Sequence, residues 1–141
     1  MTIQQGQCTV FKKNVLSGLE NFAAGTSYVY KIALYTALAD LSYATTAYTT
    51  SNELSSGNGY TAGGKVLTPI VPATSGQTAY VSFNNVTWNP ASFTCRGALI
   101  YNSTTGAAVA VLDFGNDKSA SNTFTITFPT ANSTDAIIRF S

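Results

Sequence analysis

The carboxylates are the residues that could do chemistry in this chain, because it contains no histidine. Histidine is the commonest general base and the commonest neutral metal ligand, so its absence removes the usual acid–base and metal-binding arrangements. Of the six Asp and Glu residues, only Asp113 and Asp117 lie close together in sequence. Their segment, LDFGNDKSASN, could form half of a carboxylate site or a Ca²⁺ loop, but it lacks the EF-hand spacing and the closing Glu. We therefore interpret both carboxylates as solvated turn residues.

Two glycine-containing motifs match fragments of nucleotide-binding signatures. The Asp-Phe-Gly at residues 113–115 has the letters of the kinase magnesium motif, but the chain has neither the Gly-rich loop with its lysine nor the catalytic-loop signature. The four glycines between residues 57 and 64 fit neither the dinucleotide fingerprint nor the Walker pattern, and so they are interpreted as turn glycines. The sequence thus predicts a protein that is not an enzyme, with no catalytic, cofactor-binding or metal-binding residues.

Charge is sparse in this chain. Lys and Arg number 7 and Asp and Glu number 6, and charged residues make up 9% of the sequence, against about 25% in ordinary domains. With a net charge of +1, no field attracts nucleic acid or an anionic membrane, and neither is predicted as a partner. A surface with few charges suits packing against copies of the chain or a larger assembly, although a Thr/Ser-rich β-protein without partners would have the same composition.

The two cysteines and the amino terminus give expectations about compartment. Cys8 and Cys95 could form one disulfide, but a lone pair without a secretory signal is more often two buried thiols, and we expect free thiols. The start, MTIQQGQCTVFKKN, lacks a charged segment followed by an apolar core, and no apolar run of about 18 residues occurs. We expect a protein made in the cytoplasm without a membrane anchor.

The stretch from Thr78 to Gly115 has the two-residue periodicity of a β-sheet. The pattern predicts three strands, over residues 80–84, 93–102 and 107–112. Proline has no hydrogen-bond donor for a ladder, so residues 88–90 interrupt the first pair, while residues 102–106 supply the turn of a short hairpin. The expected arrangement is a β-meander.

Outside this stretch, one helix is expected, over residues 9–22, because apolar residues recur there at helical spacing. Gly18 weakens it by up to about 1 kcal/mol relative to alanine, and Gly25 is well placed to end it. The helix is interpreted as a cap on one end of a β-core, with insertion into a partner's groove as the alternative. The residues of its apolar stripe are Phe11, Val15, Leu19 and Phe22.

Further strands are expected on both sides of the central stretch. Ser27–Thr36 alternates strongly and is predicted to be central, whereas Pro69 and Pro72 place the strand over residues 65–71 at a sheet edge. Two more strands are expected over residues 122–128 and 136–140. Residues 1–141 are therefore predicted to form one all-β domain, a β-sandwich or a jelly-roll-like barrel with one short N-terminal amphipathic helix.

Residues 37–64 are predicted to be a long loop or arm, with a short turn at residues 51–54. Ordering each arm residue costs about 1 to 2 kcal/mol of backbone entropy, and its few large apolar side chains supply about 1.5 to 3 kcal/mol apiece when buried. We therefore expect an interaction arm that takes its final shape only against a neighbouring subunit or the shell of a larger assembly. The alternative is an arm folded on its own sandwich, against Tyr28, Tyr30 and Tyr35. The candidate contact residues are Tyr43, Tyr48, Asn52, Glu53, Leu54 and Tyr60.

Aromatic content leaves a second possibility open. The chain has eight tyrosines and one tryptophan, and aromatic faces stack on sugars as well as packing in cores and interfaces. These residues are spread over predicted strands and loop alike, so most are interpreted as core or interface aromatics rather than as a sugar platform.

Three separated pieces of the sequence form a recognisable combination. They are FKKNVLSG at residues 11–18; KIALYT at 31–36 with TSNELSSGNGYTAGG at 50–64; and VTW at 86–88 with CRGALIY at 95–101 and VLDFGNDKSASN at 111–122. Together they resemble a family of small structural proteins of tailed bacteriophages. The resemblance spans about residues 11–140, and its most specific piece is the Asn52-Glu53 turn followed by GYTAGG. Compared with the family pattern, the strand connection at residues 104–107 is shorter, so a contact made there could be missing.

This resemblance implies a virion component, assembled in the host cytoplasm. It favours a capsid decoration or cement protein that stabilises the head shell, with the major capsid protein and copies of itself as partners, in a homotrimer. The alternatives are a tail or adsorption component that binds a host-surface glycan and, well behind it, a lytic enzyme that uses Asp113 and Asp117.

Overall fold

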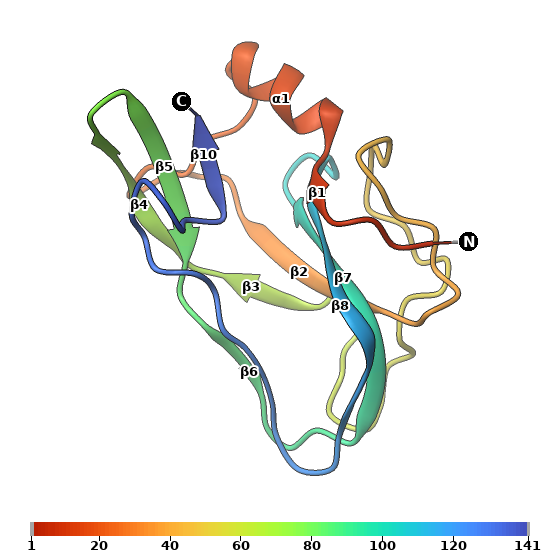
Figure 1. The fold of residues 1–141 in the computed structure, drawn as a ribbon. Helices are drawn as coiled ribbons and strands as arrows, with labels where there is room; N and C mark the ends of the chain where they lie inside the picture. Colours follow the sequence, from red (N-terminus) through yellow and green to blue (C-terminus); the bar gives the residue numbers. More distant parts are fainter. Residues whose placement is uncertain (1, 141) are drawn as a thin grey trace.

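The structure is a computed structural model that describes residues 2–140. These residues form an all-β fold with one short helix, as the sequence predicts (Figure 1). The elements are β1 (Gly6–Gln7), α1 (Thr9–Leu16), β2 (Tyr30–Tyr35), β3 (Lys65–Leu67), β4 (Pro69–Ser75), β5 (Thr78–Phe83), β6 (Val86–Trp88), β7 (Phe93–Asn102), β8 (Ala108–Ala120), β9 (Phe124–Ile126) and β10 (Ile138–Phe140).

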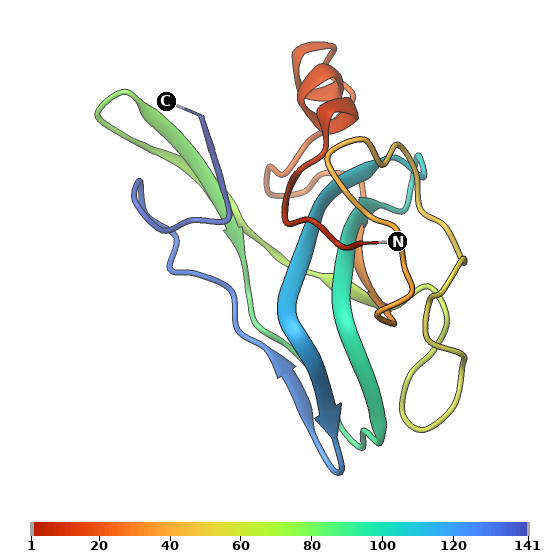
Figure 2. The ribbon, with the colours of Figure 1, turned by 45° about the vertical axis from the view of Figure 1, so that its right-hand side comes forward.

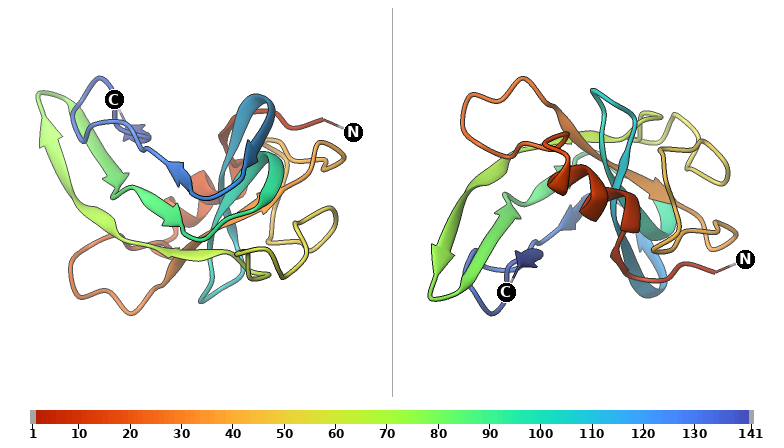
Figure 3. Two further views of the ribbon diagram at one scale, coloured as in Figure 1. Left: turned by 90° about the horizontal axis from the view of Figure 1, so that it is seen from below. Right: turned by 90° about the horizontal axis from the view of Figure 1, so that it is seen from above.

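The strands form three antiparallel sheets, with the orders β1-β8-β7-β2-β3, β10-β5-β4 and β6-β9. Figure 2 shows the two smaller sheets as one layer and the five-stranded sheet as the other, a β-sandwich-like arrangement. The helix α1 lies at one end of this sandwich (Figure 3). Its Phe11 is fully buried and belongs to the core. The predicted position of the helix as a cap is therefore confirmed.

Aromatic side chains fill the core in two groups. Near α1, Phe22 stacks on Tyr30 with 4.4 Å between ring centroids and meets Phe83 at 5.9 Å. At the other end of the sandwich, Trp88 meets Phe93 and Phe124 at 6.4 and 5.9 Å. Each buried ring contributes on the order of 1.5 to 3 kcal/mol, so these two groups hold the two layers together at both ends.

The predicted meander over residues 78–115 is wrong. β7 and β8 do pair as a hairpin, but β5 pairs with β4 and β10 in the other layer. From β5 the chain continues into β6, turns through the cis Asn89-Pro90 peptide bond and only then enters β7. Alternation of apolar and polar residues shows which face of a strand is buried, but it does not show which strand lies beside it.

The helix is shorter than the predicted range of residues 9–22. It ends at Leu16 because Gly18, with φ at 74°, adopts the left-handed conformation. The Gly18 N–H bonds to the Val15 carbonyl at 3.2 Å and the Leu19 N–H to the Asn14 carbonyl at 2.8 Å. These two bonds are those of a Schellman motif, so Gly18 terminates the helix in place of Gly25.

The edge prediction for residues 65–71 is confirmed, although this segment belongs to two strands. β3 forms one edge of the five-stranded sheet, and β4 forms one edge of the three-stranded sheet. β4 continues past Pro72, because a register shift between Ile70 and Ala73 accommodates the missing donor.

The other predicted features concern β2 and the cysteines. β2 lies inside the five-stranded sheet between β7 and β3, which confirms that the strand in Ser27–Thr36 is central. Cys8 and Cys95 are buried free thiols, and burial raises the pKa of both, to about 11 and about 12. Within residues 2–140, no helix has the length and apolar character needed to cross a membrane.

Candidate functional site: the 37–64 arm

The arm, residues 37–64, connects β2 to β3 and runs alongside the five-stranded sheet (Figures 1 and 2). Its first half bonds to segments far away in sequence. The Gln4 N–H bonds to the Leu41 carbonyl at 2.8 Å, and the Tyr48 N–H bonds to the Gly106 carbonyl at 2.9 Å. The arm therefore joins the N-terminal segment to the turn between β7 and β8.

Glu53 gathers three hydrogen-bond donors at the centre of the arm. The Tyr60 hydroxyl donates to its Oε2 at 2.5 Å, and the Gly63 N–H donates to the same oxygen at 2.6 Å. The Tyr48 hydroxyl donates to Oε1. Hydrogen bonds to a charged group contribute about 1.5 to 3 kcal/mol each, so this carboxylate fixes the middle of the arm to its end. We call Tyr48, Glu53, Tyr60 and Gly63 the Glu53 network.

The phenols of the Glu53 network stay protonated at neutral pH. Burial, followed by the hydrogen bond to Glu53, raises the pKa of both Tyr48 and Tyr60. Tyr60 is 2% exposed, and its hydroxyl oxygen also accepts the Leu34 N–H of β2 at 3.0 Å. Through this bond Tyr60 links Glu53 to the backbone of the sheet.

Two tyrosines of the five-stranded sheet donate hydrogen bonds to the arm. The Tyr101 hydroxyl donates to the Gly63 carbonyl at 2.6 Å, and its ring stacks on Tyr48 with 4.5 Å between centroids. The Tyr35 hydroxyl donates to the Thr49 carbonyl at 2.6 Å. In this single chain the arm is thus in contact with its own sandwich, the arrangement that the sequence leaves as the alternative.

Gly64 brings the end of the arm against the β2 backbone. Its φ is 84°, and a Cβ at this position would lie 1.8 Å from the Ile32 carbonyl oxygen. Only glycine allows both this conformation and this approach. The arm ends at this close contact, and β3 begins at the next residue, Lys65.

The six candidate contact residues do not form one surface. Tyr48, Glu53 and Tyr60 are brought together in the Glu53 network, whereas Tyr43 is 64% exposed and lies apart from it. The Leu54 N–H bonds to the Leu34 carbonyl at 3.0 Å. Asn52, with φ at 62°, donates from Nδ2 to the Leu38 carbonyl.

Part of this site was not predicted from the sequence. The turn expected at residues 51–54 exists, but Glu53 forms a bridge with Tyr35 instead of starting a helical turn. The contribution of Tyr101 was missed. The available signal was a tyrosine near the end of a predicted strand, since a buried hydroxyl needs a polar partner, but the sequence does not show which segment supplies that partner.

The Asp113 and Asp117 pair lies on β8, so the interpretation of both as turn residues is wrong. Asp113 Oδ1 accepts the Gly115 N–H at 2.9 Å and lies 3.2 Å from Arg96 Nε. The Gly115 hydrogen bond, followed by Arg96, lowers the pKa of Asp113. This carboxylate is thus engaged in local pairing, while Asp117 is exposed.

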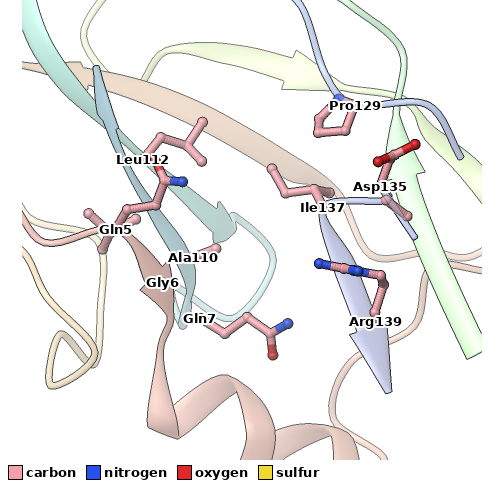
Figure 4. A pocket seen from close by; sticks show the side chains of 11 residues that line it. Gln5, Gly6, Gln7, Ala110, Leu112, Pro129, Asp135, Ile137 and Arg139 are labelled. Carbon is pink, nitrogen blue, oxygen red and sulfur yellow. The ribbon is translucent and has the colours of Figure 1, made fainter. Parts of the chain in front are cut away.

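A groove of about 340 Å³, lined by both polar and apolar residues, lies between the β1–β8 edge of the five-stranded sheet and the segment that leads into β10 (Figure 4). Gln5 and Gln7 line it on one side, and Asp135 and Arg139 line it on the other. Asp135 accepts a bond from the Asn132 side chain at 3.0 Å, and Arg139 donates to the Thr134 carbonyl. Its charged groups therefore already have local partners.

Comparisons of the chain with protein-family models, with curated proteins and with solved structures gave no match. Among the described residues, no group of three or more Cys, Asp or Glu is arranged to hold a metal ion.

Proposed function

We propose that this protein is a virion structural protein of a tailed bacteriophage, bound as a decoration or cement protein to the outside of the capsid shell. The observation that carries the proposal is the apolar surface on β3 and β4. Val66 is 58% exposed, Ile70 37% and Val71 57%. These three exposed apolar residues lie within six residues of the sequence, on two edge strands. Exposed apolar side chains that gather on a surface mark interaction sites, and a decoration protein buries such area at many equivalent positions of a shell.

The two prolines of β4 limit the ways in which the edge of this strand can bind a partner. An unpaired strand at a sheet edge adds further strands through its backbone, but Pro69 and Pro72 have no N–H to donate. Contact through the β4 edge therefore uses side chains, among them those of Ile70 and Val71, and Val66 adds an exposed apolar side chain on the neighbouring edge strand β3. Such a contact joins folded units without extending the β4 edge.

The arm contributes a second exposed element. Leu38 is 62% exposed and Tyr43 64%, while the Glu53 network holds the arm in place behind them. A pre-formed arm loses little conformational entropy on binding. We propose that Leu38 and Tyr43 contact the major capsid protein, and that copies of the chain associate as a homotrimer.

The geometry does not favour the glycan-binding alternative. Trp88 is 1% exposed, and one face of the half-buried Tyr48 ring is stacked on Tyr101. Tyr43 is 64% exposed, but it lies apart from these two rings and does not form a platform with them. A sugar platform needs ring faces that are open to solvent.

Binding to purified capsid shells that lack the protein tests the proposal. We expect the double variant Val66→Asp, Val71→Asp to fold and to lose at least about tenfold in shell affinity, because it places charges in an apolar contact. Thr74→Asp, on the same exposed strand, is the matched control and should bind as the wild type does. Electron microscopy of intact particles should place the protein on the head.

Binding of the isolated protein to host cells, with none to shells, would overturn the proposal in favour of the adsorption component. Sedimentation that gives a monomer at high concentration, together with single copies on the particle, would contradict the trimer.

A further inference from the structure

Asn58 and Gly59 occupy the tip of a tight turn in the arm. The Gly57 N–H bonds to the Tyr60 carbonyl at 2.8 Å, and the Tyr60 N–H bonds to the Gly57 carbonyl at 3.0 Å. The φ angles of Asn58 and Gly59 are 56° and 94°, close to those of a type I′ turn, which favours the Asn-Gly pair. Both residues are exposed, and Asn58 is the only asparagine of the sequence that precedes a glycine.

An Asn-Gly peptide bond can rearrange without any enzyme. The Gly59 nitrogen attacks Cγ of the Asn58 side chain and forms a C–N bond, while its proton leaves with the side-chain amide as ammonia. Water then opens the cyclic imide at either carbonyl and gives aspartate or isoaspartate at position 58. Glycine favours this attack, because it has no Cβ to hinder the backbone nitrogen and leaves the chain free to turn. Asn58 is therefore the asparagine of this chain with the most reactive neighbour.

The folded turn holds this peptide bond in an orientation that prevents the attack. In a type I′ turn, ψ of the first central residue is about 30°, which places the Gly59 nitrogen on the far side of the Cα–C bond from the Asn58 Cβ. Closure of the imide ring requires the nitrogen and Cβ to lie on the same side of that bond. The Asn58–Gly59 peptide unit must therefore rotate before Asn58 can react.

Contacts with the segment that leads into β7 oppose this rotation. The Ser92 N–H bonds to the Asn58 carbonyl at 2.9 Å. Gly59 lies so close to Pro90 that a Cβ on it would be 2.0 Å from the Pro90 carbonyl oxygen. The peptide unit is thus held from both of its residues, and it rotates only when the tip of the arm leaves the sandwich.

We propose that Asn58 is a modification site that converts to aspartate or isoaspartate when the arm opens and is protected while the arm is docked. Tyr60 anchors the tip, because it is 2% exposed and donates to Glu53. Isoaspartate adds one atom to the main chain between positions 58 and 59, so the turn no longer fits against Pro90. Opening of the arm therefore becomes irreversible once isoaspartate has formed. None of these contacts involves a partner, so the modification does not depend on the proposed function.

Incubation of the full chain at mildly alkaline pH, followed by peptide mapping and mass spectrometry, tests the proposal. Replacement of the side-chain NH₂ by OH raises the mass, and electron-transfer fragmentation distinguishes isoaspartate from aspartate. Conversion at Asn58 should be at least about tenfold slower in the folded protein than in the chain denatured by guanidinium chloride, because the folded arm is open for only a small fraction of the time. Equal rates in the two states would overturn the protection. Slower conversion at Asn58 than at Asn116 or Asn132 in the denatured chain would overturn the choice of site.

Variants of the Glu53 network connect the reaction to arm opening. Glu53→Ala and Tyr60→Phe each remove the hydrogen bond between these two side chains, and each should convert at Asn58 at least about threefold faster than the folded wild type. Tyr60→Phe keeps the buried ring, so it provides the comparison even if circular dichroism shows Glu53→Ala to be unfolded. Asp40→Ala removes an exposed carboxylate from the same arm and should convert at the wild-type rate. Wild-type rates in the folded network variants, or equal acceleration in Asp40→Ala, would refute the link to the arm.

The refolded products test whether opening becomes irreversible. Ion exchange separates the converted chains, which carry an additional negative charge, and the Leu34 amide reports docking because it donates to the Tyr60 hydroxyl oxygen. This amide should exchange at least about tenfold faster in the isoaspartate form than in the wild type. Asn58→Asp carries the same charge on a normal main chain and should exchange as the wild type does, because aspartate also suits this turn position. Wild-type exchange in the isoaspartate form, or equally fast exchange in Asn58→Asp, would overturn the irreversible step.

Discussion

Removing the Glu53 carboxylate is the sharpest test of how the arm is held. In Glu53→Ala, the Tyr60 hydroxyl and the Gly63 N–H lose their acceptor, while the half-buried Tyr48 can turn toward water. A buried donor left without a partner costs about 1 to 3 kcal/mol. The almost fully buried Tyr60 hydroxyl should cost about 1 to 3 kcal/mol and the half-buried Gly63 N–H about 1 kcal/mol, so the free energy of unfolding should fall by about 2 to 4 kcal/mol.

Urea denaturation measures this loss, and hydrogen exchange locates it. For a chain of this size, 1 kcal/mol corresponds to roughly 3 to 5 °C in Tm, so Glu53→Ala should melt about 6 to 20 °C lower. Faster exchange is expected at the Gly63 and Leu34 amides, which depend on Glu53 directly or through Tyr60.

Two further variants make the result specific to the network. Asp40→Ala removes an exposed carboxylate from the same arm and should stay within about 0.5 kcal/mol of the wild type. Tyr48→Phe removes one donor and should cost about 1 to 2 kcal/mol, with less than additive loss in the double variant with Glu53→Ala. A Glu53→Ala protein as stable as the wild type, or an Asp40→Ala protein equally destabilised, would refute the reasoning.

Three other predictions follow from the same contacts. Folding raises the pKa of Tyr60 from its ordinary value of 10.0, so above about pH 10 the unfolded chain binds fewer protons than the folded protein. The free energy of unfolding should therefore fall as the pH rises from there. Urea denaturation across this pH range should show a weaker pH dependence for Tyr60→Phe than for the wild type. Gly64→Ala should unfold the end of the arm or lower the free energy of unfolding by more than about 3 kcal/mol, because its Cβ would lie 1.8 Å from the Ile32 carbonyl oxygen. The control is Gly76→Ala, which also has a positive φ, of 59°, but has open space around the new Cβ. It should lower the free energy of unfolding by only about 1 to 2 kcal/mol in the same denaturation assay. Amide exchange over residues 43–60 should already be slow in the free protein and change little in assembled particles, whereas fast exchange when free would restore the sequence-based expectation of an arm ordered by assembly.

The sequence was informative where a local rule decides the structure. Periodicity identified most of the strands, and the proline pair placed β4 at an edge, because these properties depend on neighbouring residues alone. The start of α1 followed from the apolar spacing, but its end did not. Both Gly18 and Gly25 adopt positive φ, and the sequence does not show which of two such glycines ends a helix first.

Sheet membership was not predictable, because it depends on contacts between segments far apart in sequence. β5 and β7 have the same alternation, and yet they belong to different layers. The Glu53 network also depends on contacts between separate segments. Its donors come from residues 48, 60 and 63, and the Leu34 N–H of β2 donates in turn to the Tyr60 hydroxyl oxygen. A glutamate in a polar loop gives no sign that two hydroxyls and one backbone N–H converge on its carboxylate.

Both half-buried glutamates are held by donors from their own chain. Glu53 uses both of its oxygens on such donors, so the arm needs no partner to satisfy its polar groups. Glu20 accepts the Tyr30 hydroxyl and the Asn102 side-chain amide on Oε1, and its Oε2 is closed to solvent. Contact with a partner is therefore expected at the exposed apolar side chains of the arm and of β3–β4 rather than at either carboxylate.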